Sequence, residues 1–501
     1  MLQKIFSTYL SHRYKNLLQI QANPMAAQER AFQRLKKNLA GTKIQSLTEL
    51  GTSRNLTEFA RRAEVRTYKD YSAWIQQSLS GQADLMHRDK LLYVGLSSGT
   101  TNPQSKSVLY NEKMVKAWER FQLNIATVVE NSSSVEFLNH KRLTWGSTPH
   151  LETLSNGTQA GYVSGFLASR SPRIIRNNSY PKNETLLLTD MPAKMKRMSS
   201  ELKGVDLRLI SGVPSYLVNV FETLRAEWGV SNLSEAFPNL QTCLYSGTAI
   251  HAWKDQINEL IGQPLKYFGV YAATEGAFGY EIPEINGGQN GRFSFHLEDF
   301  VLLFRKFGED RKVVTLDGLS PGDEVELLLS SPNGLVNYSL GDALRITTVQ
   351  PYITFEILGR IGQGMNVAAE KVSQQELSLA VERASRALAT NVRHFFVHPG
   401  QSHQGRPTYS WTLALDEPEK VSAAKWSEAL DRALMDVNDD YREARVDLQF
   451  VDIPKVNFIS NGIVQNYFRA VAGRGQLKMK SIFASEESFS EYLGVMMKVP
   501  A

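Results

Sequence analysis

The sequence YVGLSSGTTNPQSKSVLY, residues 93–110, joins two short apolar segments through a loop that ends at Lys106. The loop opens with a row of small residues: Ser97, Ser98, Gly99, Thr100 and Thr101. A plain turn needs fewer of them, whereas a loop that holds phosphate oxygens combines hydroxyls with backbone N–H groups. The row therefore indicates either a phosphate-binding loop or a polar surface loop.

The composition is that of a folded protein with more than one domain. The chain has 501 residues, 42% of them hydrophobic and 21% charged, and single cores stop growing at roughly 250–300 residues. The net charge of +5 is small for this length, and no dense Lys/Arg block indicates nucleic-acid binding. The single cysteine, Cys243, excludes an intrachain disulfide and is expected to be a buried thiol in the apolar string TCLYSG.

No segment has the composition of a signal peptide or a membrane span. The amino-terminal MLQKIFSTYLSHRYKNLLQI mixes charged and apolar residues at helical spacing. No stretch approaches the about 20 apolar residues that a bilayer span needs. We therefore expect a cytoplasmic protein.

The order of apolar runs predicts an α/β architecture. Residues 1–90 have helical spacing, and short apolar runs then alternate with helix-like stretches at 214–228 and 251–262. The predicted strands lie in LLYVGL (91–96), ETLLLTD (184–190), DLRLISGV (206–213) and LQTCLYSG (240–247). Ligands favour the carboxyl ends of strands in such sheets, which is where the hydroxyl loop lies.

The later segments predict a β-rich region followed by a small α+β domain. Alternating apolar runs fill residues 291–356, and the glycines of GRIGQG (359–364) suit a hinge. Two helix-like stretches follow, at 370–389 and 423–446, with strand-like HFFVHP, YSWTLAL and LQFVDI around the second. We expect an amino-terminal domain at 1–357 and a carboxy-terminal domain at 358–501.

Three further segments carry residue types suited to a nucleotide. YSGTAI (245–250) follows a predicted strand, and YFGVYAATEGAFGYE (267–281) contains Thr274 and Glu275. NYSLGDALRI (337–346) contains Asp342 in a Gly-Asp turn. Each segment alone is typical of ordinary turns and surface loops. The specific feature is their order along the chain together with the hydroxyl loop.

In this order the segments resemble the motifs of the adenylate-forming superfamily, which includes acyl-CoA synthetases, peptide-synthetase adenylation domains and luciferases. The resemblance is closer to the Gretchen Hagen (auxin-responsive promoter) family of acyl-acid amido synthetases, in particular its bacterial branch. The family's first motif begins Ser-Ser-Gly-Thr and ends in lysine, as at 97–106. Its second and third motifs are similar to Tyr-Ala-Ala-Thr-Glu at 271–275 and Tyr-Ser-Leu-Gly-Asp at 338–342.

The resemblance implies a large amino-terminal adenylate-forming domain, with β-sheets flanked by helices, and a smaller, mobile carboxy-terminal domain. It also implies ATP-dependent adenylation of a carboxylic acid with release of pyrophosphate. The acyl group would then pass to an amine, such as an amino acid, to form an amide. ATP and Mg²⁺ are the implied cofactors, and the implied partners are a small acid and an amine, without nucleic acid or membrane.

The resemblance assigns roles to individual residues. The implied nucleotide-binding set is Ser97, Ser98, Gly99, Thr100, Thr101, Gly247, Thr248, Tyr271, Ala272, Thr274, Asp342 and Arg360. The implied catalytic residues are Lys106, Thr274, Glu275 and Lys478. Within these sets Glu275 would hold Mg²⁺, Asp342 would accept both ribose hydroxyls, and Tyr271 would pack on the adenine face. Lys478 also suits a solvated basic tail.

The implied acyl pocket lies on an apolar helix. Its residues are Val213, Tyr216, Leu217 and Val220. Their spacing is equally that of an ordinary core-facing helix. The residues alone therefore leave both interpretations open.

Three departures from the family's motifs remove positive charge or flexibility near the phosphates. Ser339 stands where arginine is usual, Glu356 stands where many relatives have lysine, and Asn102–Ser105 replace a stretch with a glycine and an acidic residue. Two alternative functions remain. One is a ligase that transfers to coenzyme A or a carrier-protein thiol, and the other is a member that binds nucleotide or acyl ligand without turnover.

Overall fold

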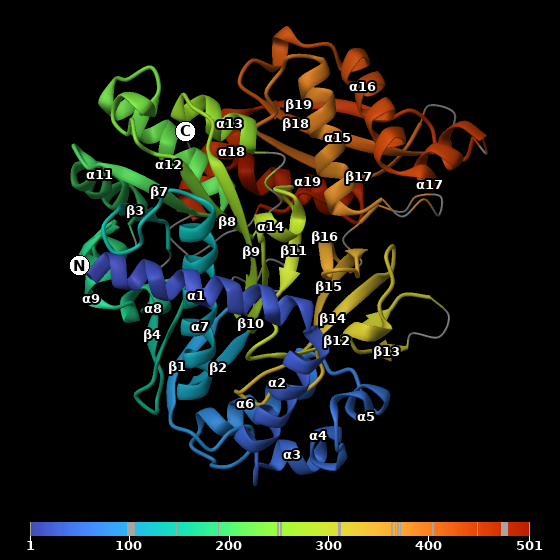
Figure 1. Ribbon diagram of the computed structural model, residues 1–501. Coiled ribbons are helices and arrows are strands. Elements are labelled where there is room, and N and C mark those ends of the chain that lie inside the picture. The colour runs from blue at the N-terminus through green and yellow to red at the C-terminus, as the bar shows by residue number, and fades with distance from the viewer. Residues whose placement is uncertain are drawn as a thin grey trace. The chain divides into compact units, whose positions relative to one another are not determined.

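The structure, a computed structural model, describes residues 2–97, 106–146, 148–188, 190–247, 250, 253–308, 312–361, 364–365, 367, 370, 372–402, 405–447, 449–471 and 479–499. The chain divides into two compact units. The larger comprises Met1–Ile250 and Ile257–Ile357, and the smaller comprises His251–Gln256 and Leu358–Ala501. Figure 1 shows the elements of both units.

The segment before the first strand is helical, as its spacing predicts. Its helices are α1 (Leu2–Ala22), α2 (Pro24–Asn38), α3 (Lys43–Leu47), α4 (Glu49–Thr52), α5 (Leu56–Arg61) and α6 (Tyr68–Leu79). Side-chain caps fix the starts of the shorter ones, because Asn55 accepts from the Glu58 N–H and Thr67 forms a capping box with Asp70. Leucines and aromatic residues on these helices are buried in the core of the larger unit.

The hydroxyl loop connects two strands of a small four-stranded sheet. Its strands are β2 (Ser107–Asn111), β1 (Leu91–Leu96), β5 (Gln159–Gly161) and β4 (Glu152–Thr153), in this order. Because β1 and β2 are antiparallel neighbours, the loop between them joins two adjacent strands. Asn111 ends β2 and accepts from the Met114 N–H at 2.8 Å, which starts α7 (Glu112–Ser132). Helices α1 and α7 lie side by side (Figure 1).

The large sheet has a parallel half and an antiparallel half. Its order is β13 (Val313–Val314), β12 (Val301–Lys306), β14 (Glu324–Ser330), β15 (Tyr338–Thr348), β16 (Thr354–Arg360), β11 (Arg292–Phe295), β10 (Gly276–Tyr280), β9 (Lys266–Ala273), β8 (Thr242–Ser246), β7 (Leu207–Gly212), β3 (Lys141–Thr144) and β6 (Ser179–Tyr180). Strands β6, β3, β7, β8 and β9 pair in parallel. The β9–β10 hairpin is antiparallel and joins this half to the other.

Helices connect the strands of the parallel half. They are α10 (Asn183–Leu186), α11 (Met191–Leu202), α12 (Pro214–Trp228) and α13 (Lys254–Ile261). The helices α8 (Val163–Arg170) and α9 (Arg173–Asn177) lead from the small sheet into β6, and the short helix α14 (Pro283–Asn286) lies between the antiparallel strands β10 and β11. Helix α12 spans the residues that the sequence predicts, with proline in its first turn and Gly229 after its last residue at a φ of 65°.

The smaller unit packs helices against a three-stranded sheet. The sheet order is β17 (His394–Gln401), β18 (Pro407–Leu415) and β19 (Lys455–Ser460). The helices are α15 (Gln374–Ala387), α16 (Ala423–Val437), α17 (Asp439–Arg442), a π-helical turn (Glu443–Asp447), α18 (Asn461–Val471) and α19 (Glu486–Met497). The predicted α+β character of this segment is confirmed.

Two predicted strands are wrong. The run at 184–190 begins with the short helix α10, whose first turn is held by Glu201: this carboxylate accepts from the Lys182 N–H at 2.7 Å and from the Thr185 hydroxyl. The described residues 449–453 of the run at 448–453 are not a strand either, because the Phe450 N–H donates to the Ala444 carbonyl at 2.8 Å and caps the π-helical turn. The strand β19 lies just beyond it.

Two further expectations from the sequence concern the single cysteine and membrane-spanning helices. Cys243 is fully buried on β8, and burial raises the pKa of its thiol, so the structural interpretation is confirmed. Among the described residues, no helix combines the length and apolar character that crossing a membrane requires.

A buried carboxylate ties three strands together. Glu281, just after β10, accepts from the Tyr245 hydroxyl of β8, from the Gly291 N–H at 2.6 Å and from the Asn290 amide at 3.0 Å. Burial raises the pKa of Glu281. A Cβ on Gly269 of β9 would lie 2.7 Å from Tyr245 Oη and 2.8 Å from Glu281 Oε1. Only glycine therefore fits between this pair.

Replacing Gly269 tests this packing. Gly269→Ala should lower the free energy of unfolding by about 1–3 kcal/mol, because the added methyl must displace buried groups. Urea unfolding followed by circular dichroism measures the change. Gly146→Ala is the matched control in the same unit, because its Cβ would meet no atom closer than 3.6 Å. Equal stabilities for the two variants would contradict the packing argument.

Candidate functional site

The β9–β10 hairpin presents Thr274 and Glu275 at the edge where the two halves of the large sheet meet. These two residues form the hairpin loop. Strands β7, β8 and β9 are parallel, so Val213, Gly247 and Thr274, which follow them, lie along the same edge. Glu275 is only 8% exposed, although loops usually lie at the surface. Because burying a carboxylate costs free energy unless it is paired, Glu275 is a candidate functional residue.

Asp342 lies in a β-bulge, so the predicted Gly-Asp turn is wrong in detail. In the pairing of β14 with β15, Leu327 alone faces residues 340–342. Gly341 has a φ of 75°, a backbone conformation that glycine adopts readily. Within this bulge Asp342 Oδ2 accepts from the Tyr271 hydroxyl at 2.7 Å.

Two hydrogen bonds join β15 to the β9–β10 hairpin across the large sheet. One is Tyr271 to Asp342 at 2.7 Å, and the other is Tyr338 to Glu275 Oε1 at 3.2 Å. Strands β16, β11 and β10 separate β15 from β9 in the sheet order, which in a flat sheet would place them roughly 19 Å apart at about 4.8 Å per strand. The sheet therefore curls strongly and brings both carboxylates to one region.

Ser97 and Lys106 close the base of the hydroxyl loop. The Ser97 N–H donates to the Lys106 carbonyl at 3.0 Å, and the Lys106 N–H donates to the Ser97 hydroxyl at 3.1 Å. Lys106 Nζ lies 3.5 Å from Tyr338 Oη and 5.6 Å from the centroid of the Tyr68 ring. On β2, the Tyr110 hydroxyl donates to the Thr274 carbonyl at 2.6 Å. The base of the loop is thus tied to both the hairpin and β15.

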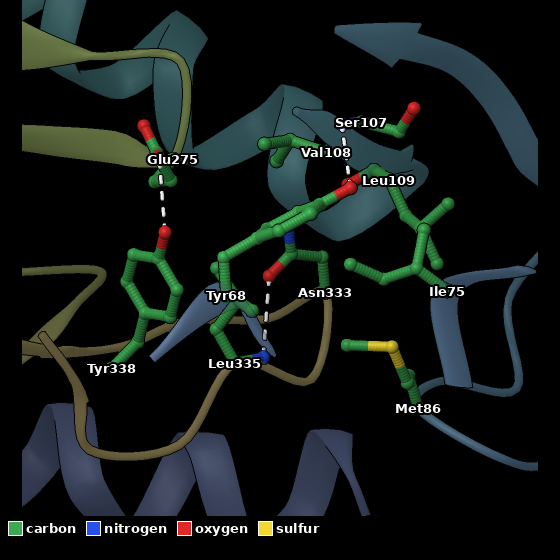
Figure 2. Close-up of a pocket in the computed structure, with 10 residues that line it drawn as sticks. All are labelled: Tyr68, Ile75, Met86, Ser107, Val108, Leu109, Glu275, Asn333, Leu335 and Tyr338. Carbon is green, nitrogen blue, oxygen red and sulfur yellow. Dashed lines mark hydrogen bonds between the residues drawn. The ribbon is translucent and has the colours of Figure 1, made fainter. Parts of the chain in front are cut away.

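A small cavity lies beneath these groups. Its volume is about 10 Å³, close to the minimum that holds one water molecule. Figure 2 shows its lining: Tyr68, Ile75, Met86, Ser107, Val108, Leu109, Glu275, Asn333, Leu335 and Tyr338. The Tyr338 hydroxyl points at Glu275 in this view. The cavity is far too small for a nucleotide, so it is a water-sized space behind the charged groups.

Glu275 has the chemistry of a metal ligand that works with a bound phosphate. Its Oε1 accepts from Tyr338, and no residue in the described part of the chain donates to its Oε2. The described residues contain no cluster of three or more His, Cys, Asp or Glu side chains that could hold a metal by themselves. Mg²⁺, which takes one or two carboxylates and completes its shell with phosphate oxygens and water, fits this arrangement.

Tyr271 has a different environment from the one expected. Its ring is only 7% exposed, and its centroid lies 4.9 Å from that of Phe278 and 5.9 Å from that of Phe355. Little of this ring is therefore open to pack on adenine in the way the resemblance implies. The buried ring instead fixes the direction of the hydroxyl that donates to Asp342.

The other predicted nucleotide residues are only partly described. Gly247 is exposed after β8, Ala272 is half-buried on β9, and Arg360 is exposed at the end of β16 in the smaller unit. Several predicted residues lie outside the described part of the chain: Ser98, Gly99, Thr100, Thr101, Thr248 and Lys478. Their roles stay predictions.

The predicted acyl-pocket residues are core side chains. Val213, Tyr216, Leu217 and Val220 are all buried at the start of α12. None of them lines the cavity of Figure 2. Their burial agrees with the core interpretation, and their role in acid binding stays a prediction.

Lys194 is a buried cation that sequence reasoning missed. It lies on α11 and is only 3% exposed. Its Nζ donates to the carbonyls of Gly146 at 3.2 Å and Leu186 at 3.1 Å, and it lies 5.3 Å from the centroid of Trp145. No described carboxylate pairs with it, and desolvation lowers its pKa to about 8. A lysine in an otherwise ordinary amphipathic helix carries no sequence signal of such burial.

Two departures from the expected motifs have local partners. The Ser339 hydroxyl donates to the buried Glu326, which also pairs with Arg305. Glu356 lies 3.7 Å from Arg292 on the neighbouring strand. These side chains are engaged away from the contacts of Glu275 and Asp342 described above.

Known protein families match both parts of the chain. Residues 13–263 match the GH3 family N-terminal domain, and residues 375–487 match the GH3 family C-terminal domain. The chain is 24% identical over 176 residues to the indole-3-acetic acid-amido synthetase GH3.4 of Arabidopsis thaliana, covering 33% of this chain and 29% of that protein. It is 29% identical over 124 residues to the putative indole-3-acetic acid-amido synthetase GH3.10 of Oryza sativa subsp. japonica, covering 24% and 26%. The matches thus span under a third of these curated relatives.

Solved structures share the fold over nearly the whole chain. The AtGH3.15 acyl acid amido synthetase in complex with 2,4-DB superposes with a TM-score of 0.77 at 16% identity, covering 99% of both chains. A 2-hydroxyisobutyryl-CoA ligase in the postadenylation state superposes with a TM-score of 0.62 at 11% identity, covering 95% and 92%. The predicted α/β adenylate-forming fold, with a large and a smaller unit, is confirmed.

The burial of Lys194 predicts a pH dependence of stability. Its folded pKa of about 8 lies below the ordinary 10.5, so between these values the unfolded chain binds more protons and stability rises with pH. Relative to Lys194→Met, the wild-type free energy of unfolding should rise by up to about 3 kcal/mol from pH 8 to pH 10.5. Denaturant unfolding across this range measures it. Lys196→Met, exposed on the same helix, is the control. Parallel profiles for wild type and Lys194→Met would contradict the assignment.

Proposed function

This chain belongs to the GH3 family, and we propose that it is an ATP-dependent ligase. It adenylates a carboxylic acid and transfers the acyl group to an amine. One observation carries the proposal: Lys106, Glu275 and Asp342 gather at the curled sheet, where Tyr338 and Tyr271 hold them. The pairing of a hydroxyl loop with two separate carboxylates suits a magnesium nucleotide.

In the first step an oxygen of the acid attacks the α-phosphorus of ATP. The new bond joins the acyl oxygen to phosphorus, and the bond to the β-phosphate breaks and releases pyrophosphate. Both reactants are anionic, so catalysis depends on positioning and on neutralising charge. Residues 97–101 donate hydrogen bonds to the phosphates, and Lys106 neutralises the charge of the departing pyrophosphate. Asp342 accepts hydrogen bonds from the ribose hydroxyls.

Glu275 is the proposed Mg²⁺ ligand, through the oxygen that does not accept from Tyr338. Bound there, Mg²⁺ would neutralise phosphate charge. Thr274, beside it in the hairpin loop, donates to the α-phosphate. Gly247 and Thr248 line the adenine together with Ala272.

In the second step an unprotonated amine attacks the acyl carbon of the adenylate. A carbon–nitrogen bond forms, the bond from carbon to the phosphate oxygen breaks, and AMP leaves while the amine loses a proton. The domain formed by residues 358–501 moves against residues 1–357 between the two steps. Arg360 and Lys478 belong to the moving part, and Lys478 neutralises charge during adenylation.

Glu275→Gln tests the first step. The amide can still accept from the Tyr338 hydroxyl, so the fold should hold, but the charge for Mg²⁺ is lost. ATP–pyrophosphate exchange, measured with a panel of acids, should fall at least about 100-fold. Circular dichroism and melting temperature control for folding. Wild-type exchange in the variant would refute the metal role, and no exchange by the wild type with any acid would favour a non-catalytic binder.

The acceptor class is tested on the preformed adenylate. Amino acids, other amines, coenzyme A and a carrier-protein thiol are supplied in parallel, and mass spectrometry identifies the product. The proposal expects an amide and AMP from an amine, with thiols leaving the adenylate unchanged. A thioester as the main product would assign the chain to thiol transfer.

A further inference from the structure

Tyr338 bridges the two oppositely charged groups of the site. Its Oη lies 3.5 Å from Lys106 Nζ and 3.2 Å from Glu275 Oε1. A phenol has one donor and acceptor lone pairs, so it accepts from the lysine while donating to the carboxylate. We propose that Tyr338 is a positioning residue that keeps Lys106 and Glu275 apart and aims Glu275 at the metal–nucleotide complex. This inference rests on the proposed function.

The backbone around Tyr338 is held from both sides. The Arg66 N–H donates to the Asn337 carbonyl at 3.0 Å, and the Ser339 N–H donates to the Arg66 carbonyl at 2.7 Å. The Tyr71 hydroxyl donates to the carbonyl of the residue before Asn337 at 2.6 Å. Tyr338 itself is only 1% exposed. The hydroxyl therefore has little freedom to leave its place between the two charges.

The bond to Tyr338 leaves Glu275 with one committed oxygen. Oε1 accepts from the Tyr338 hydroxyl, which restrains the carboxylate and leaves Oε2 as a single-oxygen metal ligand. Figure 2 shows the Tyr338 ring standing on one side of Glu275. Without the hydroxyl, the carboxylate is free to turn toward Lys106, and opposite charges at short range attract. Such an ion pair would occupy the carboxylate oxygen that ligates the metal, whereas Lys106, whose ammonium has three donors, could still donate to a phosphate.

This role separates metal binding from nucleotide binding. Asp342, the proposed ribose ligand, is held by Tyr271, and the hydroxyl loop is closed by the hydrogen bonds between Ser97 and the Lys106 backbone, so both keep these contacts without the Tyr338 hydroxyl. Losing it should therefore weaken binding of the metal complex while metal-free ATP binds as before. A purely structural role would weaken both forms together.

Tyr338→Phe in the full-length chain tests this separation. Calorimetry should give a metal-free ATP dissociation constant within about twofold of wild type. The tightening that Mg²⁺ provides should shrink about tenfold, and electron paramagnetic resonance should show a similar loss in Mn²⁺ affinity with a non-hydrolysable ATP analogue. Tyr93→Phe is the matched control, because it removes a buried hydroxyl that donates to the Pro149 carbonyl at 2.7 Å. It should leave both affinities unchanged.

A second substitution tests the separation of charges. In the Tyr338→Phe background, Lys106→Met removes the competing cation, so the Mn²⁺ affinity measured at saturating ATP analogue should recover most of its loss, even though the missing lysine weakens nucleotide binding itself. Unchanged metal dependence in Tyr338→Phe, an equal loss of metal-free binding, an unfolded variant or no rescue would each overturn the positioning role. If the wild type itself binds no magnesium nucleotide, the proposed function fails, and that outcome is visible before any variant is compared.

Discussion

Two phenol–carboxylate hydrogen bonds across a curled sheet are the constraint on which the site depends. Tyr271 donates to Asp342 and Tyr338 donates to Glu275, although three strands separate β15 from β9 in the sheet. These contacts require β15 to return over the β9–β10 hairpin. The bulge at Gly341 and the burial of the hairpin tip are the local consequences of that return.

The surrounding packing makes the curl rigid. Glu281 and Tyr245 lock β8 to the end of β10, with room between them only for the glycine of β9. Tyr110 fastens the small sheet to the hairpin through the Thr274 carbonyl. Each bond links segments that are distant in sequence, and each lies where water is excluded, so the loss of one partner would leave a buried polar group unsatisfied. The positions of the site residues are thus set by hydrogen bonds within the core rather than by contacts inside the site's loops.

Each charged group of the proposed site has a separate role. In the proposed function the lysine neutralises phosphate charge, one carboxylate holds a metal and the other holds a sugar, while neutral phenols donate to both carboxylates. The serine in place of the family's arginine donates to Glu326, which also pairs with Arg305. With Lys106 as the described cation beside Glu275, the proposed reaction would depend on the hydroxyl loop and a metal to offset the remaining phosphate charge. This is the setting in which the direction of one carboxylate matters most.

Elements with local signals could be predicted from the residues alone: the amino-terminal helices, β1, α12, the order of the motifs and the family. Periodicity and capping act between residues close in the chain, so they are readable without a fold. The residues alone could not determine that 184–190 begins as a helix held by Glu201, that Lys194 is buried, or that Tyr338 joins Lys106 to Glu275. Those facts depend on contacts between distant segments, and only the curl of the sheet in three dimensions decides them.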